Sequence, residues 1–288
     1  MNKQIIISTK EAQSNRRLSA FFRDQGFVPH IIDRNQIIPG AQLVITEKTV
    51  TWGQHDLLEH TRFALILDSG YMWPQPYIRP SPDEWNYYRN NLDEYLRNER
   101  EAASFWNSFL DILNSRVPVC LNPQAGFEAA AFKPCSFAGL CRLGIPLPPY
   151  LVTNDYTRVE EFAGQYSLLY RPALSEGSRG GWCTREEALA SVKEQTPLFL
   201  QGLTAQDEVV IRALNGRVLH TVPEGFAADS LPVKSIQEAL HLPLAELHFR
   251  CHDSWVLSDF SAAPSLDILP AAAFDAFCTC LLELGDTG

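Results

Sequence analysis

The segment from residue 166 to residue 188 reads YSLLYRPALSEGSRGGWCTREEA. Its apolar run ends at Tyr170 and predicts a strand that leads directly into the basic residue Arg171. Thr184, followed three residues later by Glu187, has the spacing of a helix capping box. The loop between strand and helix carries three glycines, Gly177, Gly180 and Gly181. Such a loop either covers a phosphate with backbone N–H groups or forms a plain surface turn, and the segment alone leaves both open.

The composition narrows the class of protein. The chain has 288 residues, 45% of them hydrophobic, and a net charge of −10, which disfavours nucleic acid and anionic membranes as partners. No stretch reaches the roughly 20 consecutive apolar residues of a membrane span. The first apolar run, KQIIIS, is too short for a signal peptide. The seven scattered cysteines form no CxxC pair and are expected to be reduced thiols. We therefore expect a cytoplasmic protein.

The order of predicted elements indicates three lobes. In residues 1–115, short apolar strands alternate with a helix through Leu18 and Phe22, which predicts an α/β lobe, and a long helix follows a proline-rich loop and ends near Ser115. Residues 116–200 mix short helices with strands. In residues 201–288, two hairpins are predicted, one at Asn215-Gly216 and one at residues 252–254, before a closing helix.

Three pieces of the chain carry a resemblance to a known family. They are YIRPSPDEW with the later ERE, then CLNPQAGFEAAAFKPCSFAGLCRLGIPLPPYLVTND at residues 120–155, and SWVLSDFSAAPSL at residues 254–266. In order and spacing, over about residues 60–288, they resemble the ATP-grasp superfamily. The similarity is greatest to the peptide-modifying ligases that make graspetides of the microviridin type, and then to ribosomal-protein glutamate ligases. The resemblance implies two antiparallel-sheet subdomains after an N-terminal α/β lobe.

This resemblance also implies a chemistry. ATP would lie between the two antiparallel sheets with Mg²⁺, a carboxylate would be phosphorylated to an acyl phosphate, and an amine or alcohol would displace the phosphate. The protein would contribute positioning and charge stabilisation. The substrate would be a peptide or a small-molecule carboxylate, and the resemblance leaves open a homodimer or a second subunit.

The family's two phosphate lysines match Lys133 and Arg171, and the resemblance makes Arg171 a catalytic residue as well. An arginine keeps the positive charge and can bind phosphate through two hydrogen bonds, although its fork is wider than an ammonium group. We expect both side chains to face one cleft and the loop at residues 175–182 to be mobile without nucleotide. The resemblance makes the loop a phosphate cover, with contributions from Ser175, Gly177, Ser178, Gly180 and Gly181.

The family's adenine-binding hinge matches FLQGL. Gln201 and Leu203 fit it, whereas Gly202 stands where an acidic residue is usual. Glu208 falls near a ribose-contacting acid. Arg212 lies two residues beyond the family's catalytic strand arginine and on the same strand face, so it serves either catalysis or structure.

Two alignments of the last strand are possible for the metal site. In the preferred one, Glu246, Asp259 and Ser261 are the Mg²⁺ ligands of a weakened site, and Glu246 lies opposite Asp259. We then expect Asp259→Asn to abolish Mg²⁺-dependent ATP binding and to leave the fold intact. In the other alignment Ser258 and Phe260 take the ligand positions and the site is lost. An exposed hairpin with ordinary acids is the structural alternative, and His248 and His252 are read as surface or packing residues.

Two functions follow. One is an ATP-dependent ligase that joins a carboxylate to an amine or alcohol. The other is a degenerate ATP-grasp subunit that binds a nucleotide, a peptide or a partner without chemistry, because Arg171, Gly202, Asp259 and Ser261 all depart from the family pattern. An α/β oxidoreductase is disfavoured, since no GxGxxG follows the first strand.

Overall fold

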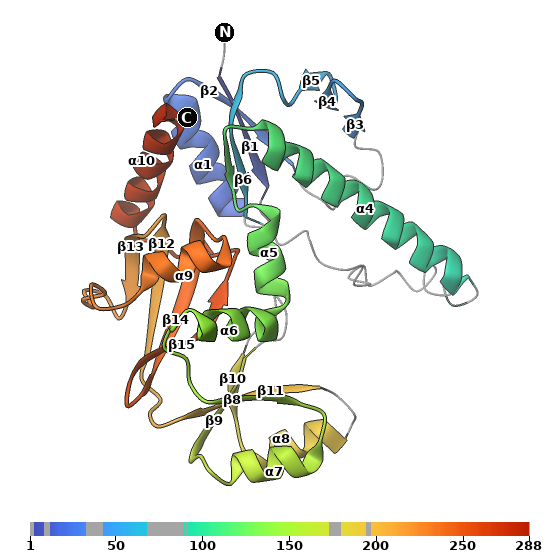
Figure 1. Ribbon diagram of the computed structural model, residues 1–288. Helices are drawn as coiled ribbons and strands as arrows, with labels where there is room; N and C mark the ends of the chain where they lie inside the picture. Colours follow the sequence, from blue (N-terminus) through green and yellow to red (C-terminus); the bar gives the residue numbers. More distant parts are fainter. Residues whose placement is uncertain are drawn as a thin grey trace. The chain divides into compact units, whose positions relative to one another are not determined.

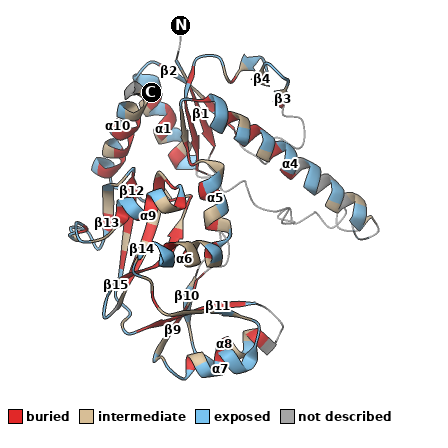
Figure 2. Cartoon of the chain, in the orientation of Figure 1, coloured by how far each residue is buried: buried red, intermediate tan, exposed pale blue. Residues whose placement is uncertain are grey.

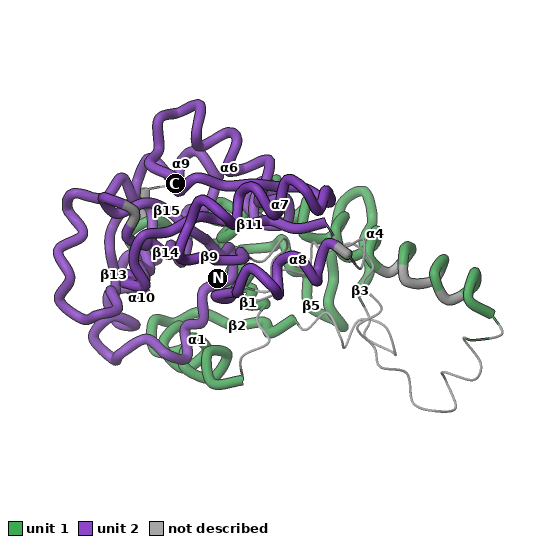
Figure 3. The backbone as a smooth tube through the Cα atoms, turned by 90° about the horizontal axis from the view of Figure 1, so that it is seen from below, with its two compact units in different colours: residues 1–124, 282–288 green, residues 125–281 purple. Residues whose placement is uncertain are grey.

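The computed structural model describes residues 3–8, 12–32, 43–67, 89, 91–172, 180–193 and 197–287. The chain divides into two compact units (Figure 3). The first comprises residues 1–124 and 282–288, and the second comprises residues 125–281. The two sheets expected in separate subdomains after residue 116 both lie in the second unit.

The first unit is built on a parallel sheet with the strand order β2-β1-β6-β7. Its strands are β1 (Lys3–Ser8), β2 (Phe27–Ile31), β6 (Thr61–Ile66) and β7 (Val119–Leu121). Helix α1 (Ala12–Asp24) buries Leu18 and Phe22, and the ring of Phe22 contacts Phe27 and Phe63. Gly26 follows the helix with φ 79°, where a glycine is favoured. The predicted α/β lobe is therefore present.

A small antiparallel sheet and a long helix complete the described part of this unit. The small sheet consists of β3 (Leu43–Ile45), β4 (Val50–Trp52) and β5 (His55–Asp56). Helix α4 spans Leu92–Arg116, one residue beyond the expected end. Trp106, Phe109, Leu110 and Leu113 are buried along it, as the helical spacing predicts. The proline-rich loop lies outside the described residues.

The second unit contains an antiparallel sheet of order β10-β9-β11-β8, called sheet C here. Its strands are β8 (Tyr150–Thr153), β9 (Leu168–Arg171), β10 (Gly181–Cys183) and β11 (Leu198–Leu203). Helices α7 (Tyr156–Ala163) and α8 (Arg185–Lys193) cover one face of it, where Val159, Val192 and Leu200 share a core cluster. The other surface of α7 is exposed (Figure 2).

The capping box before α8 is confirmed. The backbone N–H of Glu187 donates to the Thr184 hydroxyl at 3.1 Å, and the Thr184 N–H donates to the Glu187 carboxylate at 2.8 Å. Two N–H groups that the helix leaves without acceptors are thereby satisfied.

The second antiparallel sheet, sheet D, has the order β13-β12-β14-β15 (Figure 1). Its strands are β12 (Glu208–Leu214), β13 (Arg217–Val222), β14 (Leu244–His252) and β15 (Ser254–Ser261). Both predicted hairpins form. Asn215 and Gly216 have φ 48° and 82°, and Asp253 has φ 59° at the other turn.

Aromatic rings join sheet D to sheet C, and the remaining helices belong to the second unit except for Gln124 and the end of α10, which belong to the first. The helices are α5 (Gln124–Ala131), α6 (Lys133–Arg142), α9 (Val233–Leu240) and the closing helix α10 (Ala271–Thr287). Phe137 of α6 packs edge-on against Phe199 of sheet C, 5.2 Å between centroids, and stacks on Phe260 of β15 at 6.1 Å. None of the helices in the described ranges is both long and apolar enough to cross a membrane.

Candidate functional site

One face of sheet D carries a row of charged and polar side chains. In strands, every second residue points to the same face, and directly paired residues share a face. Glu246 pairs with Arg212 on one side and with Ser261 on the other, while His248 pairs with Asp259. This polar face therefore consists of Glu208, Arg212, Glu246, His248, Arg250, Asp259 and Ser261.

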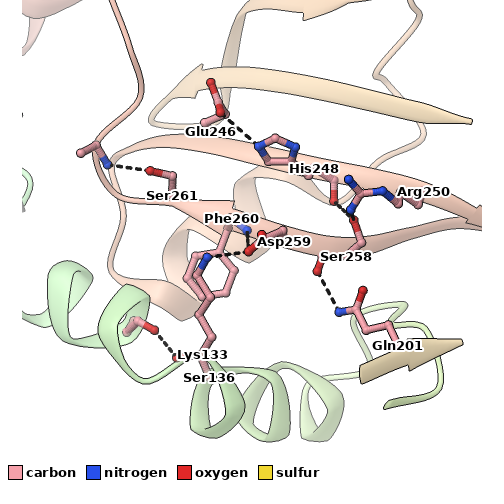
Figure 4. Close-up of polar contacts among 12 residues, drawn as sticks. Lys133, Ser136, Gln201, Glu246, His248, Arg250, Ser258, Asp259, Phe260 and Ser261 are labelled. Atoms are coloured by element: carbon pink, nitrogen blue, oxygen red, sulfur yellow. Dashed lines mark hydrogen bonds and ion pairs between the residues drawn. The ribbon is translucent and has the colours of Figure 1, made fainter. Parts of the chain in front are cut away.

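A β-bulge sets the register of β15. His248 pairs with Asp259 and the next residue, Phe249, pairs with Leu257, so Ser258 is an extra residue in the ladder. Ser258 therefore shares the polar face with Asp259. Its hydroxyl accepts a hydrogen bond from Arg250 at 2.7 Å and donates one to the His248 carbonyl at 3.0 Å (Figure 4). Strict alternation would place the Ser258 side chain on the other face of the sheet, and the bulge turns it to the polar face.

The register supports the alignment that puts Asp259 and Ser261 on the same face as Glu246. One detail of that expectation was wrong, because Glu246 lies opposite Ser261, not opposite Asp259. Phe260 lies on the other face with Phe137, which excludes it as a ligand position.

Asp259 is held by Lys133. The Lys133 ammonium donates to the Asp259 carboxylate at 2.6 Å, and the two residues are only 3% and 7% exposed. The backbone N–H of Phe260 donates to the same oxygen at 2.9 Å. The expectation that Asp259→Asn leaves the fold intact assumed an exposed acid, and this assumption was wrong because Asp259 is buried and paired. Breaking a buried ion pair leaves an uncompensated charge and is strongly destabilising.

A chain of alternating charges crosses the polar face. His248 contacts Glu246 through Nε2 and Glu208 through Nδ1, both at 3.0 Å. Arg212 contacts the other oxygen of Glu246 at 2.6 Å, and Arg250 contacts Glu208. Burial by itself would lower the pKa of His248, but the hydrogen bonds to Glu208 and Glu246 outweigh it and raise the pKa to about 9. His248 is thus an internal partner of two carboxylates.

The contacts with His248 also affect the pKa values of Glu208 and Glu246. The hydrogen bond from His248 lowers the pKa of Glu208. Burial would raise the pKa of Glu246, but the hydrogen bond from His248 and the charge of Arg212 together lower it. Both acids are therefore ionised and paired at neutral pH.

Arg212 is bound on two sides. Besides its ion pair with Glu246, its Nη1 lies 3.0 Å from Nδ1 of His220, whose pKa is lowered by burial and by the Arg212 charge. Arg212 is almost completely buried between these partners.

Sequence reasoning interpreted His248 as a surface or packing residue and did not name Arg250. The Arg250 guanidinium lies 3.6 Å from the centre of the Tyr170 ring, which also packs edge-on against Trp182 at 5.6 Å. Arg250 thereby joins sheet D to sheet C through a cation–π contact. The alternation of Glu246, His248 and Arg250 along β14 is a polar pattern of period two, and this signal could have revealed both residues.

The structure does not bring Arg171 to Lys133. Tyr170 faces Arg250, so its neighbour Arg171 lies on the opposite face of sheet C. There its guanidinium donates to the hydroxyl of Ser191 on α8 at 3.2 Å. The expectation that Lys133 and Arg171 face one cleft was therefore wrong. Tyr170 and Arg171 follow one another in β9, so their side chains point to opposite faces of sheet C.

The predicted phosphate loop is only partly described. Ser175, Gly177 and Ser178 lie outside the described residues, and so does the expectation of mobility for most of the loop. At Gly180 a Cβ atom would lie 2.2 Å from the Tyr170 hydroxyl, whereas at Gly181 it would meet nothing within 4 Å. Close packing against Tyr170 therefore requires a glycine at position 180.

The residues of the predicted adenine-binding hinge, Gln201, Gly202 and Leu203, are all buried. Gln201 is fully buried and donates to the Ser258 carbonyl at 2.8 Å. A Cβ atom at Gly202 would lie 2.3 Å from the Tyr166 ring, and the Gly202 N–H donates to the Pro149 carbonyl at 3.0 Å. The glycine that replaces the family's acid thus makes room for an aromatic ring, and Leu203, also buried, packs with Tyr170.

The expected metal ligands do not fit a divalent cation in this arrangement. Glu246 is held by Arg212 and His248, Asp259 by Lys133, and the Ser261 hydroxyl accepts a hydrogen bond from the Ala263 N–H at 3.1 Å. Within the described ranges, no three His, Cys, Asp or Glu side chains gather as a group able to hold a metal ion. Lys133, Arg212 and His248 contact these acids where the alignment places a metal ion.

Comparisons with known proteins address the fold. No protein-family model and no curated protein matches the sequence. Solved structures do match: the ATP-grasp ligase PsnB complexed with a phosphomimetic variant of minimal precursor, Mg and ADP has a TM-score of 0.79 at 13% identity and is covered over 99% of both chains. The macrocyclase MdnC bound with precursor peptide MdnA, from Microcystis aeruginosa MRC, has a TM-score of 0.69 at 15% identity, with 98% of this chain and 100% of that chain covered.

A third structure extends the comparison. The RiPP-associated ATP-grasp ligase of Chryseobacterium gregarium, in complex with ADP and a leader and core peptide, has a TM-score of 0.67 at 12% identity, over 99% of this chain and 97% of that chain. The chain therefore has the ATP-grasp fold from end to end. This confirms the α/β fold with two antiparallel sheets and the resemblance that the three sequence pieces carry.

Proposed function

We propose that this protein binds a nucleotide as a non-catalytic ATP-grasp subunit. The buried ion pair between Lys133 and Asp259 carries the proposal. A phosphoryl-transfer site needs a free cation for the phosphates and free carboxylates for Mg²⁺. Here Lys133, which was expected to bind phosphate, and Asp259, which was expected to bind Mg²⁺, neutralise each other.

Two further contacts support a binding role. Arg171, expected as the second phosphate cation, bonds to Ser191 on the other face of its sheet. Tyr166 takes the space that an acidic hinge side chain would need next to Gly202. The groups that catalysis would require are thus engaged in packing, a hydrogen bond and an ion pair, which disfavours turnover, while the likeness in fold to nucleotide-bound ligases favours nucleotide binding.

The second candidate is an ATP-dependent ligase that joins a peptide carboxylate to an amine or alcohol through an acyl phosphate. The end-to-end likeness to PsnB, MdnC and the Chryseobacterium gregarium ligase favours it. It requires Mg²⁺ and ATP to displace Lys133 from Asp259 and the two cations from Glu246, because these acids are the ligands that a weakened Mg²⁺ site would use.

Calorimetry and nucleotide analysis on the full chain separate the two candidates. We expect ATP and ADP to bind, and ATP to be recovered unchanged after long incubation with MgCl₂ and a mixture of Glu- and Asp-rich peptides. Formation of ADP above background together with a dehydrated peptide product, detected by mass spectrometry, would establish the ligase instead. A protein that binds neither nucleotide would contradict both candidates and would favour a peptide- or partner-binding role. Light scattering on the same sample reports a homodimer or a bound second subunit.

A further inference from the structure

Two histidine side chains meet in the first unit, whereas sheet D and its polar face belong to the second. His30 lies in β2, the edge strand of the parallel sheet, and His55 lies in β5 of the small antiparallel sheet. The centroids of their rings are 5.2 Å apart, and the ring planes are inclined by 51°. The candidate nucleotide site uses neither residue, so the pair calls for an explanation of its own.

The local structure brings the two rings together. Phe27, in the same strand as His30, packs against Phe22 of α1. Successive residues of a strand alternate between its faces, so His30 points to the face of the sheet opposite α1. His55 pairs with Trp52 at the tight end of the β4–β5 hairpin. The two histidines thus connect an edge strand to the end of a hairpin.

One nitrogen of this pair is buried without a partner. His30 is only 8% exposed, and its Nε2 atom has no hydrogen-bond partner among the described residues. A neutral imidazole has one N–H and one lone pair, and a buried polar atom that lacks a partner is destabilising. His55, in contrast, is exposed, so its ring can be reached from solvent. A metal ion is a ligand that two imidazole lone pairs can share.

The spacing of the rings fits one tetrahedral ion. Zn²⁺ binds imidazole nitrogens at about 2.0–2.1 Å, so two imidazoles bound at a tetrahedral angle have their centroids roughly 5 Å apart. The centroids of His30 and His55 have this separation. In the described ranges no third His, Cys, Asp or Glu side chain completes a metal-holding group with the pair. Water molecules would therefore fill the remaining positions and leave the site open.

We propose that His30 and His55 bind one Zn²⁺ ion, which joins β2 to the β4–β5 hairpin. Imidazole is a ligand that Zn²⁺ accepts readily, whereas Mg²⁺ prefers oxygen ligands, so this site is chemically distinct from a magnesium site for a nucleotide. The proposal concerns the first unit alone and does not depend on nucleotide binding.

Calorimetry with ZnCl₂ tests the proposal on the full chain after alkylation of its accessible thiols. We expect the wild type to bind one Zn²⁺ with a Kd at least tenfold lower than that of His55→Gln, a change at an exposed position. The matched control is His60→Asn, which should bind within twofold of the wild type. His60 is exposed in the same unit and has φ 60°, a conformation that Asn tolerates. Absence of Zn²⁺ binding to the wild type, or equal binding by His55→Gln, would overturn the proposal.

Modification by diethyl pyrocarbonate, mapped by mass spectrometry, gives a readout for each histidine of the wild type and needs no variant. A bound Zn²⁺ occupies the imidazole lone pair that reacts. We expect ZnCl₂ to slow the modification of His55 at least fivefold and to leave that of His60 unchanged. Unchanged modification of His55, or equal protection of both residues, would show that the rings of His30 and His55 only pack against each other.

Discussion

Lys133 and Asp259, 126 positions apart in the chain, form a buried ion pair with 2.6 Å between Nζ and Oδ1. The pair connects the start of α6 to β15. It also joins a residue expected, from the family resemblance, to bind phosphate with one expected to bind the metal. This contact makes the two residues a structural unit, with consequences that mutagenesis can measure.

Removal of one partner should destabilise the protein more than removal of both. Lys133→Met leaves the Asp259 carboxylate buried and unpaired, and Asp259→Asn leaves the ammonium unpaired, so each is expected to lower the free energy of unfolding by about 3–5 kcal/mol. The double variant should lose clearly less than the sum. Urea unfolding of all four proteins gives the coupling energy, and additive losses would contradict the pairing.

The His248 pKa predicts a loss of stability at alkaline pH. The pKa in the folded protein, about 9, lies above the ordinary value of 6.5. The resulting stabilisation is therefore fully present below about pH 6.5 and disappears as the pH rises through 9. It amounts to at most about 3 kcal/mol. Urea unfolding between pH 6.5 and 10 should show this decline in the wild type. In His248→Gln most of the slope should vanish, and an unchanged slope would assign it to other groups.

Gly202 should tolerate no side chain while Tyr166 is present. The Cβ of Gly202→Ala would lie 2.3 Å from the Tyr166 ring, and we expect a loss of about 1–3 kcal/mol from overpacking. In a Tyr166→Ala background the same substitution should cost much less. Gly181→Ala is the matched control, since its Cβ meets nothing within 4 Å and it lies in the same sheet. Equal losses at both glycines would exclude the ring as the cause.

Arg171 and Arg250 should differ in their effect on anion binding. Arg171→Ala removes a contact with Ser191 on the α8 face, so the Kd for ATP should change less than twofold. Arg250→Lys keeps the charge but loses the forked donor next to Glu208 and Ser258, and we expect at least a tenfold weaker Kd. Calorimetry measures both variants, with thermal unfolding as the check on folding. The reverse order of effects would restore Arg171 as the phosphate residue.

The amino-acid sequence by itself determined the local structure. Asn215-Gly216 specified a tight hairpin because both positions need positive φ, and Thr184 with Glu187 specified the start of α8 through contacts three residues apart. Helical spacing gave the buried side of α4. These local features depend on neighbours in the chain, so residue type and spacing suffice to predict them, whereas the ATP-grasp fold was expected only from the resemblance of three sequence pieces to that superfamily.

Only the tertiary structure determined which side chains of the candidate site contact one another. The bulge at Ser258 adds one residue to β15, so period-two counting along the sequence cannot give the partner of Glu246 or the direction of Ser258. Arg171 points to α8 because Tyr170 takes the face toward Arg250. The cation that neutralises Asp259 comes from another element, 126 positions away. Charges pair by distance in space, and that distance is set only when the sheets and helices pack.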